Sequence, residues 1–291
     1  MELRRRFVFR GNAAAIGGRI VRPADTILDS VVASSLTVVG GRSRARAGPA
    51  RFGEFVSFAS AATSAEGLFD NVQGQIDRTL GRIPEEYLTM TTRVSADVTG
   101  LNIGSDKPKL TITHLHASMT SKSPGGSGET SVSPGNDTVI EGVSIDGHVL
   151  TIELALPVFQ QHDTMSKLLA AADNPQFVKE SGALLYMTPT SPGATTPGTV
   201  PPPLPPARLQ YCSGTIYATI VKSIKWAGEP INGAVIDQNT VSIPDLGKLF
   251  FGELLITSES RRLTLLRGEL GSVVGGDVAC AEVDPDGTWS T

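Results

Sequence analysis

Cysteine, aromatic residues and long apolar runs are all scarce in this chain. Two of its 291 residues are Cys, and Phe, Trp and Tyr together make up 5%. Two cysteines exclude a disulfide-rich scaffold and a Cys-rich zinc module. Cys212 and Cys280 lie in strand-like runs, where we expect buried structural thiols. The longest uncharged apolar stretch, residues 30–41, is much shorter than the roughly 20 residues of a spanning helix, so we expect no membrane span.

The sequence also lacks the short motifs of common enzymes. Residues 125–128 do not form the Gly-x-Ser-x-Gly turn of a serine hydrolase. Residues 271–276 lack the Lys and Ser/Thr that hold phosphate and magnesium in a P-loop. There is no His-Glu-x-x-His zinc helix and no glycine motif for a dinucleotide. The absence of these motifs argues against an enzyme, and we predict no bound cofactor.

Positive charge is concentrated in the first part of the chain. The whole protein has 25 Lys and Arg against 29 Asp and Glu, a net charge of −4. Residues 1–51 contain ten Arg and three acidic residues, so they carry a net charge of +7 and the remainder −11. The acidic balance gives no reason to expect a nucleic-acid partner. The opposite charges of the two regions favour contacts between copies, and hence a homo-oligomer.

Three of these arginines, Arg42, Arg44 and Arg46, alternate with small residues. If this run forms a strand, residues two apart point to the same side, so all three guanidinium groups face one way. A guanidinium group can bind a carboxylate through two hydrogen bonds. We therefore predict that the run contacts an anionic group or an acidic partner surface. A solvated loop is the alternative.

The stretch Arg4-Arg5-Arg6-Phe7 has the form of a twin-arginine export signal. Such a signal needs an uncharged apolar segment after it. Arg10 follows almost at once, and the eight residues between it and Arg19 include three Gly. We therefore interpret the match as false, predict a first strand over residues 3–9, and expect a cytoplasmic location.

Strand-like alternation recurs along the whole chain. Residues 88–98 alternate apolar with polar side chains, which predicts a long strand with one face in solvent. In residues 139–156, Asp146-Gly147 suits a two-residue type I′ turn, which predicts a hairpin. Further strands are predicted at residues 52–58, 110–118, 209–226, 234–243, 248–257, 262–270 and 278–283. The predicted fold is α+β and β-dominated, mainly an antiparallel sandwich or barrel-like sheets.

A few short helices are predicted beside the strands. Thr63 and Glu66 have the spacing of a capping box, and an apolar helical face follows them. Asp163 precedes a second amphipathic run, and Pro175 occupies the favoured first position of a third. The predicted helices cover about residues 64–82, 163–172 and 175–181.

Residues 188–207 contain eight prolines and no apolar period, which is typical of an extended surface loop. Both flanks of this loop are rich in predicted strands, which could close the same sheets. We therefore favour a single domain over residues 1–291. The alternative is a division into residues 1–187 and 208–291.

Three of the four histidines fall on strand faces. His114 and His116 are two apart, and strict alternation places them on the same face as Leu110 and Ile112. With His148 from a neighbouring strand, they could supply three nitrogen ligands for a catalytic metal. Histidine at the rim of a core is the common alternative, and we expect at least one of the three to lie well apart from the others.

The leading hypothesis is a non-enzymatic, β-rich binding or assembly protein that associates with itself, since many strand edges must be covered. The sequence does not indicate which small-molecule ligand, if any, it binds. The alternative is a metal-dependent enzyme that uses His114, His116 and His148. For such a metal site, Asp137 and Glu141 are the nearest carboxylates in sequence that could accept from the free ring nitrogens.

Overall fold

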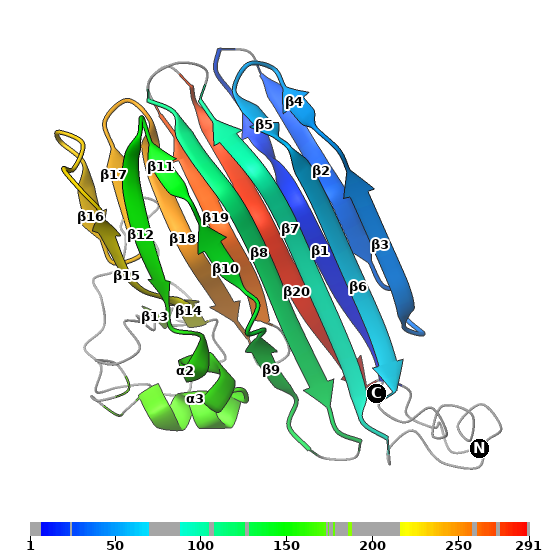
Figure 1. The fold of residues 1–291 in the computed structure, drawn as a ribbon. Helices are drawn as coiled ribbons and strands as arrows, with labels where there is room; N and C mark the ends of the chain where they lie inside the picture. Colours follow the sequence, from blue (N-terminus) through cyan, green and yellow to red (C-terminus); the bar gives the residue numbers. More distant parts are fainter. Residues whose placement is uncertain are drawn as a thin grey trace, which may run out of the picture.

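The computed structural model describes residues 7–23, 25–69, 88–104, 108–125, 128–172, 216–257, 261–271 and 274–289, and residues 174, 177, 186 and 187. In this part of the chain, two antiparallel β-sheets pack face to face and two short helices lie at one end (Figure 1). The predicted β-dominated sandwich is confirmed. No helix among the described residues is long and apolar enough to cross a membrane.

Sheet A has the strand order β13-β14-β18-β19-β20-β1-β2, and the β16–β17 hairpin is attached to β18. Its strands are β1 (Phe7–Ile20), β2 (Thr26–Ser35), β13 (Tyr186–Met187), β14 (Ile216–Thr219), β16 (Val235–Asp237), β17 (Thr240–Ile243), β18 (Gly247–Ile256), β19 (Arg261–Leu270) and β20 (Gly276–Trp289). The first long strand, β1, pairs along its length with the last, β20. The first and last described strands are therefore joined within one sheet.

Sheet B has the order β15-β12-β11-β8-β7-β5-β4; β9 and β10 also pair with β8, β6 pairs with β7, and β3 pairs with β6. Its strands are β3 (Gly41–Ala47), β4 (Ala50–Phe52), β5 (Val56–Phe58), β6 (Ser60–Phe69), β7 (Met90–Ile103), β8 (Leu110–Ser123), β9 (Ser131–Pro134), β10 (Val139–Glu141), β11 (Val143–Ile145), β12 (His148–Leu154) and β15 (Val221–Trp226). The helices are α2 (Leu156–Gln161) and α3 (Met165–Ala172).

Strands from both sides of the proline-rich segment belong to the same sheets. In sheet A, β18 to β20 stand beside β1 and β2, and in sheet B, β15 pairs with β12. The proline-rich residues 188–207 themselves lie outside the described residues.

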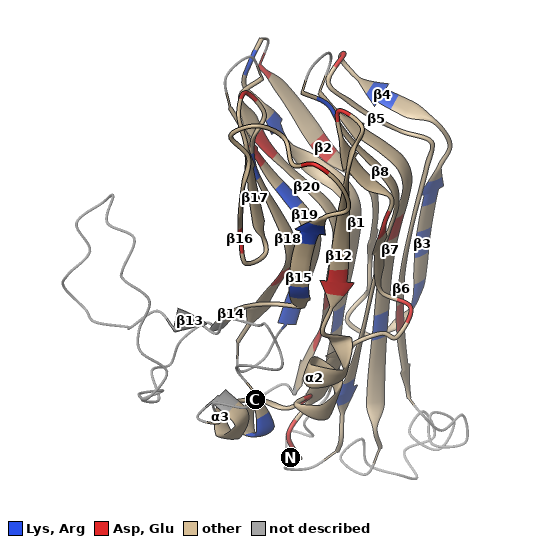
Figure 2. Ribbon diagram, turned by 60° about the vertical axis from the view of Figure 1, so that its left-hand side comes forward, with Lys and Arg blue, Asp and Glu red and all other residues tan. Residues whose placement is uncertain are grey.

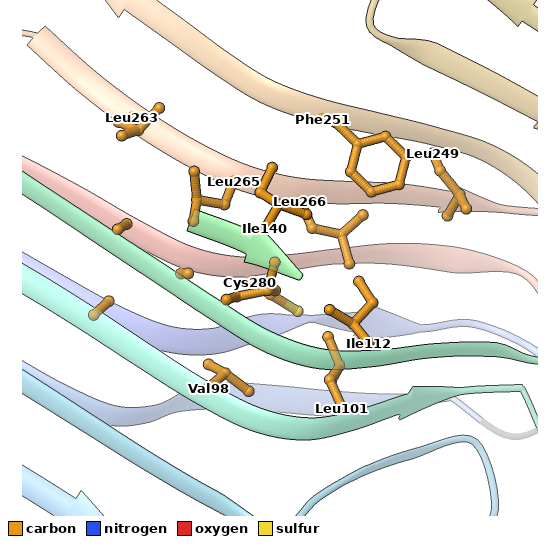
Figure 3. Packing of buried hydrophobic residues seen from close by; sticks show 14 of the residues in the cluster. Val98, Leu101, Ile112, Ile140, Leu249, Phe251, Leu263, Leu265, Leu266 and Cys280 are labelled. Carbon is orange, nitrogen blue, oxygen red and sulfur yellow. The ribbon is translucent and has the colours of Figure 1, made fainter. Parts of the chain in front are cut away.

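The core lies between the two sheets (Figure 3). Phe251 and Leu266 come from sheet A, Leu101 and Ile112 from sheet B, and all four are almost completely buried. Cys280 is also fully buried among them, and burial raises the pKa of its thiol to about 12. This thiol therefore behaves as a small apolar side chain, as predicted. The other cysteine lies outside the described residues.

The predicted helix at 64–82 is wrong where the structure describes it. Its first residues belong to β6, which pairs with β3 on one side and β7 on the other. Thr63 and Glu66 therefore form no capping box. The Thr63 hydroxyl lies 2.8 Å from the Ser34 hydroxyl, and Glu66 accepts a hydrogen bond from Arg42. Pairing with two neighbouring strands outweighs the local helical pattern.

The other helices agree better with the sequence. α3 confirms the helix predicted at 163–172, although it begins at Met165. The helix predicted at 175–181 lies outside the described residues except for Phe177. α2 was not predicted; it begins next to Pro157, directly after the hairpin.

In sheet B, the inward–outward alternation of side chains reverses part-way along the strands. β7 buries Val98 and then Leu101, so its inward residues change from even to odd numbers, and β8 changes in the same region. The reversal lies at Gly100 and Thr113, the one pair missing from an otherwise continuous register. Gly100 has a φ of +61°, a conformation that costs a residue with a side chain about 1–2 kcal/mol.

Sheet A has the same feature. Gly252, Ala281 and Val32 lie on alternate strands and have φ angles of 60°, 52° and 55°. The registers on both sides of Ala281 skip the pair that would contain it. Both sheets therefore reverse which residues face the core, and a simple period of two does not hold along their full length.

Replacing Gly100 by Ala should destabilise the fold. A Cβ atom here would lie 2.9 Å from the Cβ of Ala59, at a positive φ. Strain and overpacking together should lower the free energy of unfolding by about 2–4 kcal/mol, measured by urea denaturation. Gly48→Ala is the matched control, because its Cβ would meet no atom within 4 Å. Equal midpoints for the two variants would contradict this role of Gly100.

Candidate functional site

Two of the predicted residue sets lie on one outer face of sheet B. Arg46 pairs with Ala62, and Ala62 pairs with Asp97. Asp97 in turn pairs with His116, which completes a row across β3, β6, β7 and β8. Side chains paired in this way project from the same side of a sheet, and the neighbouring Val98 projects into the core. The arginine run and the histidine pair therefore face the same solvent.

Arg42, Arg44 and Arg46, here called the Arg row, lie along β3, which among the described strands pairs with β6 alone and is an edge strand (Figure 2). Arg42 Nε donates to Glu66 Oε1 at 2.8 Å. Arg44 and Arg46 are exposed and have no hydrogen-bond or ion-pair partner in the described part of the chain. On β6, the small side chains of Ser64 and Ala62 stand beside Arg44 and Arg46, and Glu66 stands beside Arg42.

His114 and His116 meet at a shared carboxylate oxygen. His114 Nε2 lies 2.8 Å and His116 Nδ1 lies 3.0 Å from Asp97 Oδ2. The three side chains, here called the His–Asp cluster, are 30%, 20% and 32% exposed in the order His114, His116, Asp97. Each offers one ligand atom, and these atoms all lie within 4.8 Å of one another. Two imidazoles and a carboxylate are donors suited to a transition-metal ion.

A further carboxylate stands beside each imidazole. Glu141 Oε2 lies 3.8 Å from His114 Nδ1, and Asp137 Oδ2 lies 3.3 Å from His116 Nε2. Asp137 accepts a hydrogen bond from the Ser118 hydroxyl. His116 Nε2 is shielded from solvent and makes no hydrogen bond within the described structure, so its contact with Asp137 is not an aligned one. These are the two carboxylates named from the sequence.

Hydrogen bonding keeps the carboxyl groups of Asp97 and Asp137 ionised. Burial acts to raise the pKa of Asp97, but hydrogen bonds from His114 and His116 outweigh it, and the pKa is lowered. Burial likewise acts to raise the pKa of Asp137, and the hydrogen bond from Ser118 contributes most to lowering it. Both groups therefore remain charged near neutral pH, which is the form that binds cations.

The sequence predicted the wrong face for the histidine pair. Leu110 and Ile112 point into the core, whereas His114 and His116 point outward. The reason is the reversal of alternation at Thr113, which separates the two pairs. The spacing of two correctly indicated that the two histidines share a face, but not which face.

His148 does not join the cluster. It begins β12, where its Nδ1 lies 2.9 Å from the carbonyl oxygen of Glu229. Its cross-strand partner on β11 is Ile145, and Ile145 in turn pairs with Leu110 on β8. His148 is therefore two strands away from β8, at the level of Leu110, which is four residues before His114. Strand geometry makes this a separation of roughly 16 Å.

Asp97 is the member of the cluster that the sequence prediction missed. Alternation within residues 88–98 already places it on the outer face of its strand. What the sequence does not give is the register of β7 against β8, which sets Asp97 opposite His116. A carboxylate on the wet face of a long strand was therefore the only available signal.

A family model described as a domain of unknown function (DUF8256) matches residues 7–257. No curated protein and no solved structure matches the chain. The matched range contains the Arg row, the His–Asp cluster and both outer carboxylates.

Thr138 should be essential for holding the turn that carries Asp137. Its side chain is 2% exposed, and its hydroxyl accepts from Ser118 N and donates to Ser118 O, each at 3.2 Å. Thr138→Val should lower the free energy of unfolding by about 1–2 kcal/mol, since it removes both hydrogen bonds and leaves the Ser118 N–H without this acceptor, while the Ser118 carbonyl keeps the hydrogen bond from Gly135 N. Urea denaturation measures the loss. Thr151→Val, on the exposed face of β12, should change stability by less than about 0.5 kcal/mol; a loss of equal size there would refute the assignment.

Proposed function

Because the chain belongs to the DUF8256 family, whose description names no activity, we propose its function from its geometry. It is a non-enzymatic binding and assembly protein that uses the Arg row to hold an acidic surface, in the first place that of a second copy of itself. The observation that carries this proposal is the presence of two guanidinium groups, Arg44 and Arg46, that have no partner among the described residues and lie on an exposed edge strand.

The surroundings of the Arg row suit a broad contact. Beside Arg44 and Arg46 the side chains on β6 are the small Ser64 and Ala62, so a partner can approach the sheet closely there, and no described residue occupies these two guanidinium groups. A hydrogen bond between two charged groups is roughly twice as strong as one between neutral groups. Because β3 pairs on one side only, its free backbone edge also lies next to the same partner.

A second copy offers acidic side chains on a different face. Asp277 and Glu269 are paired in register on the outer face of sheet A, and both are exposed, although Glu269 already accepts a hydrogen bond from Arg267. Asp277 has no hydrogen-bond or ion-pair partner in the described chain. Contact between the Arg row of one copy and this acidic pair of the next would be head-to-tail. It would use the opposite charges of residues 1–51 and the remainder of the sequence.

A metal-dependent enzyme with three histidine ligands is the weaker alternative, because His148 lies far from the other two. We propose no nucleic-acid partner and no bound cofactor for this function. A cytoplasmic location is part of it. In support, Phe7, which ends the twin-arginine-like stretch, is buried in β1 and pairs with Trp289, as expected for a strand retained in the fold.

The double variant Arg44→Glu/Arg46→Glu tests the proposal. Wild-type protein should self-associate at low salt and dissociate as salt rises, because exposed charges are screened beyond about 8–10 Å at physiological ionic strength. The variant should raise the dissociation constant at least tenfold, about 1.4 kcal/mol, in sedimentation velocity experiments. Arg51→Glu is the control, since Arg51, on β4, is also exposed but donates to the carbonyl of Gly53, just after that strand. A wild-type protein that stays monomeric at low salt and high concentration would rule out self-assembly.

A further inference from the structure

We propose that Asp97, His114 and His116 form a binding site for a transition-metal ion such as Zn²⁺. The site is distinct from the Arg row and does not rest on the proposed function.

Two of the three distances between the ligand atoms are those that a metal ion requires. Asp97 Oδ2 lies 2.8 Å from His114 Nε2 and 3.0 Å from His116 Nδ1. Metal–ligand bonds of about 2.0–2.1 Å place neighbouring ligand atoms roughly 2.9–3.4 Å apart in octahedral or tetrahedral geometry. The two ring nitrogens lie within 4.8 Å of each other, so an ion can replace the two hydrogen bonds by a local adjustment of the imidazoles.

The groups behind the imidazoles match those of metal sites. A histidine that binds a metal through one ring nitrogen usually donates the other N–H to a carboxylate or carbonyl. Here Glu141 stands behind His114 at 3.8 Å, and Asp137 stands behind His116 at 3.3 Å. The shielded Nε2 of His116 has no aligned hydrogen bond. Because binding of an ion at Nδ1 would fix the proton on Nε2, it would favour a hydrogen bond to Asp137.

The identity of the donors selects the class of ion. Calcium and magnesium are bound by oxygen ligands, and two of the three donors here are imidazole nitrogens. Imidazole suits zinc, copper, iron and nickel. With three protein ligands that are each 20–32% exposed, at least one coordination position faces solvent and is open to water or to a group of a partner.

Zn²⁺ titration by isothermal calorimetry, with Co²⁺ absorption as a spectroscopic check, tests the site in the full chain. The experiment is run at about 0.5 M NaCl, where the charge contacts of the proposed assembly are screened. We expect one ion per chain at this site. His116→Gln should weaken binding at least 100-fold while keeping a polar group beside Asp97, and Asp97→Asn should weaken it at least tenfold. Glu141→Gln should weaken it about tenfold, as expected for a carboxylate behind a ligand.

His148→Gln is the matched control, since this strand histidine lies outside the cluster; its affinity should stay within twofold of wild type. Arg44→Glu/Arg46→Glu should also bind Zn²⁺ like wild type, which separates failure of this site from failure of the assembly. Circular dichroism checks that each variant is folded. Absence of binding to the wild-type chain, or equal affinity of folded His116→Gln and wild type, would overturn the proposal.

Discussion

The reversal of side-chain alternation at Gly100 and Thr113 is the constraint on which the outer face of sheet B depends. If alternation continued unbroken from Ile112, both imidazoles of the His–Asp cluster would point into an apolar core without polar partners, at a cost of several kcal/mol. The positive φ of Gly100 lets β7 change parity where β8 does, so the strands stay paired. Because of this reversal, apolar side chains face the core on both sides of Gly100 and Thr113, and the His–Asp cluster faces solvent with its polar partners.

The sequence predicted the fold class because alternation is a local property that each half-strand obeys. It also predicted the hairpin turn, where Asp146 and Gly147 have φ angles of 50° and 87°, as a type I′ turn needs. The helix predicted from Thr63 failed for a non-local reason. The same residues can satisfy a helical pattern, but strands on both sides offer β6 a full set of backbone hydrogen bonds, and those strands are distant in sequence.

The candidate site was predictable only in parts. The spacing of two within His114-x-His116 and within the Arg row shows that each set shares a face. That the two sets share one face follows from three successive registers, β3 with β6, β6 with β7 and β7 with β8. No residue pattern within a single strand contains that information, so Asp97 could not be joined to His116 from sequence.

The Arg row and the His–Asp cluster are close enough to share a partner but too far apart to depend on each other. Arg46 and Asp97 stand in one row with Ala62 between them, two strand spacings or about 10 Å apart. At that distance in water, one pair of unit charges interacts by about 0.4 kcal/mol before screening by salt. A bound divalent ion would interact with the charge of Arg46 by at most twice this energy. The ion would thus add to the attraction for an acidic partner without being required for it.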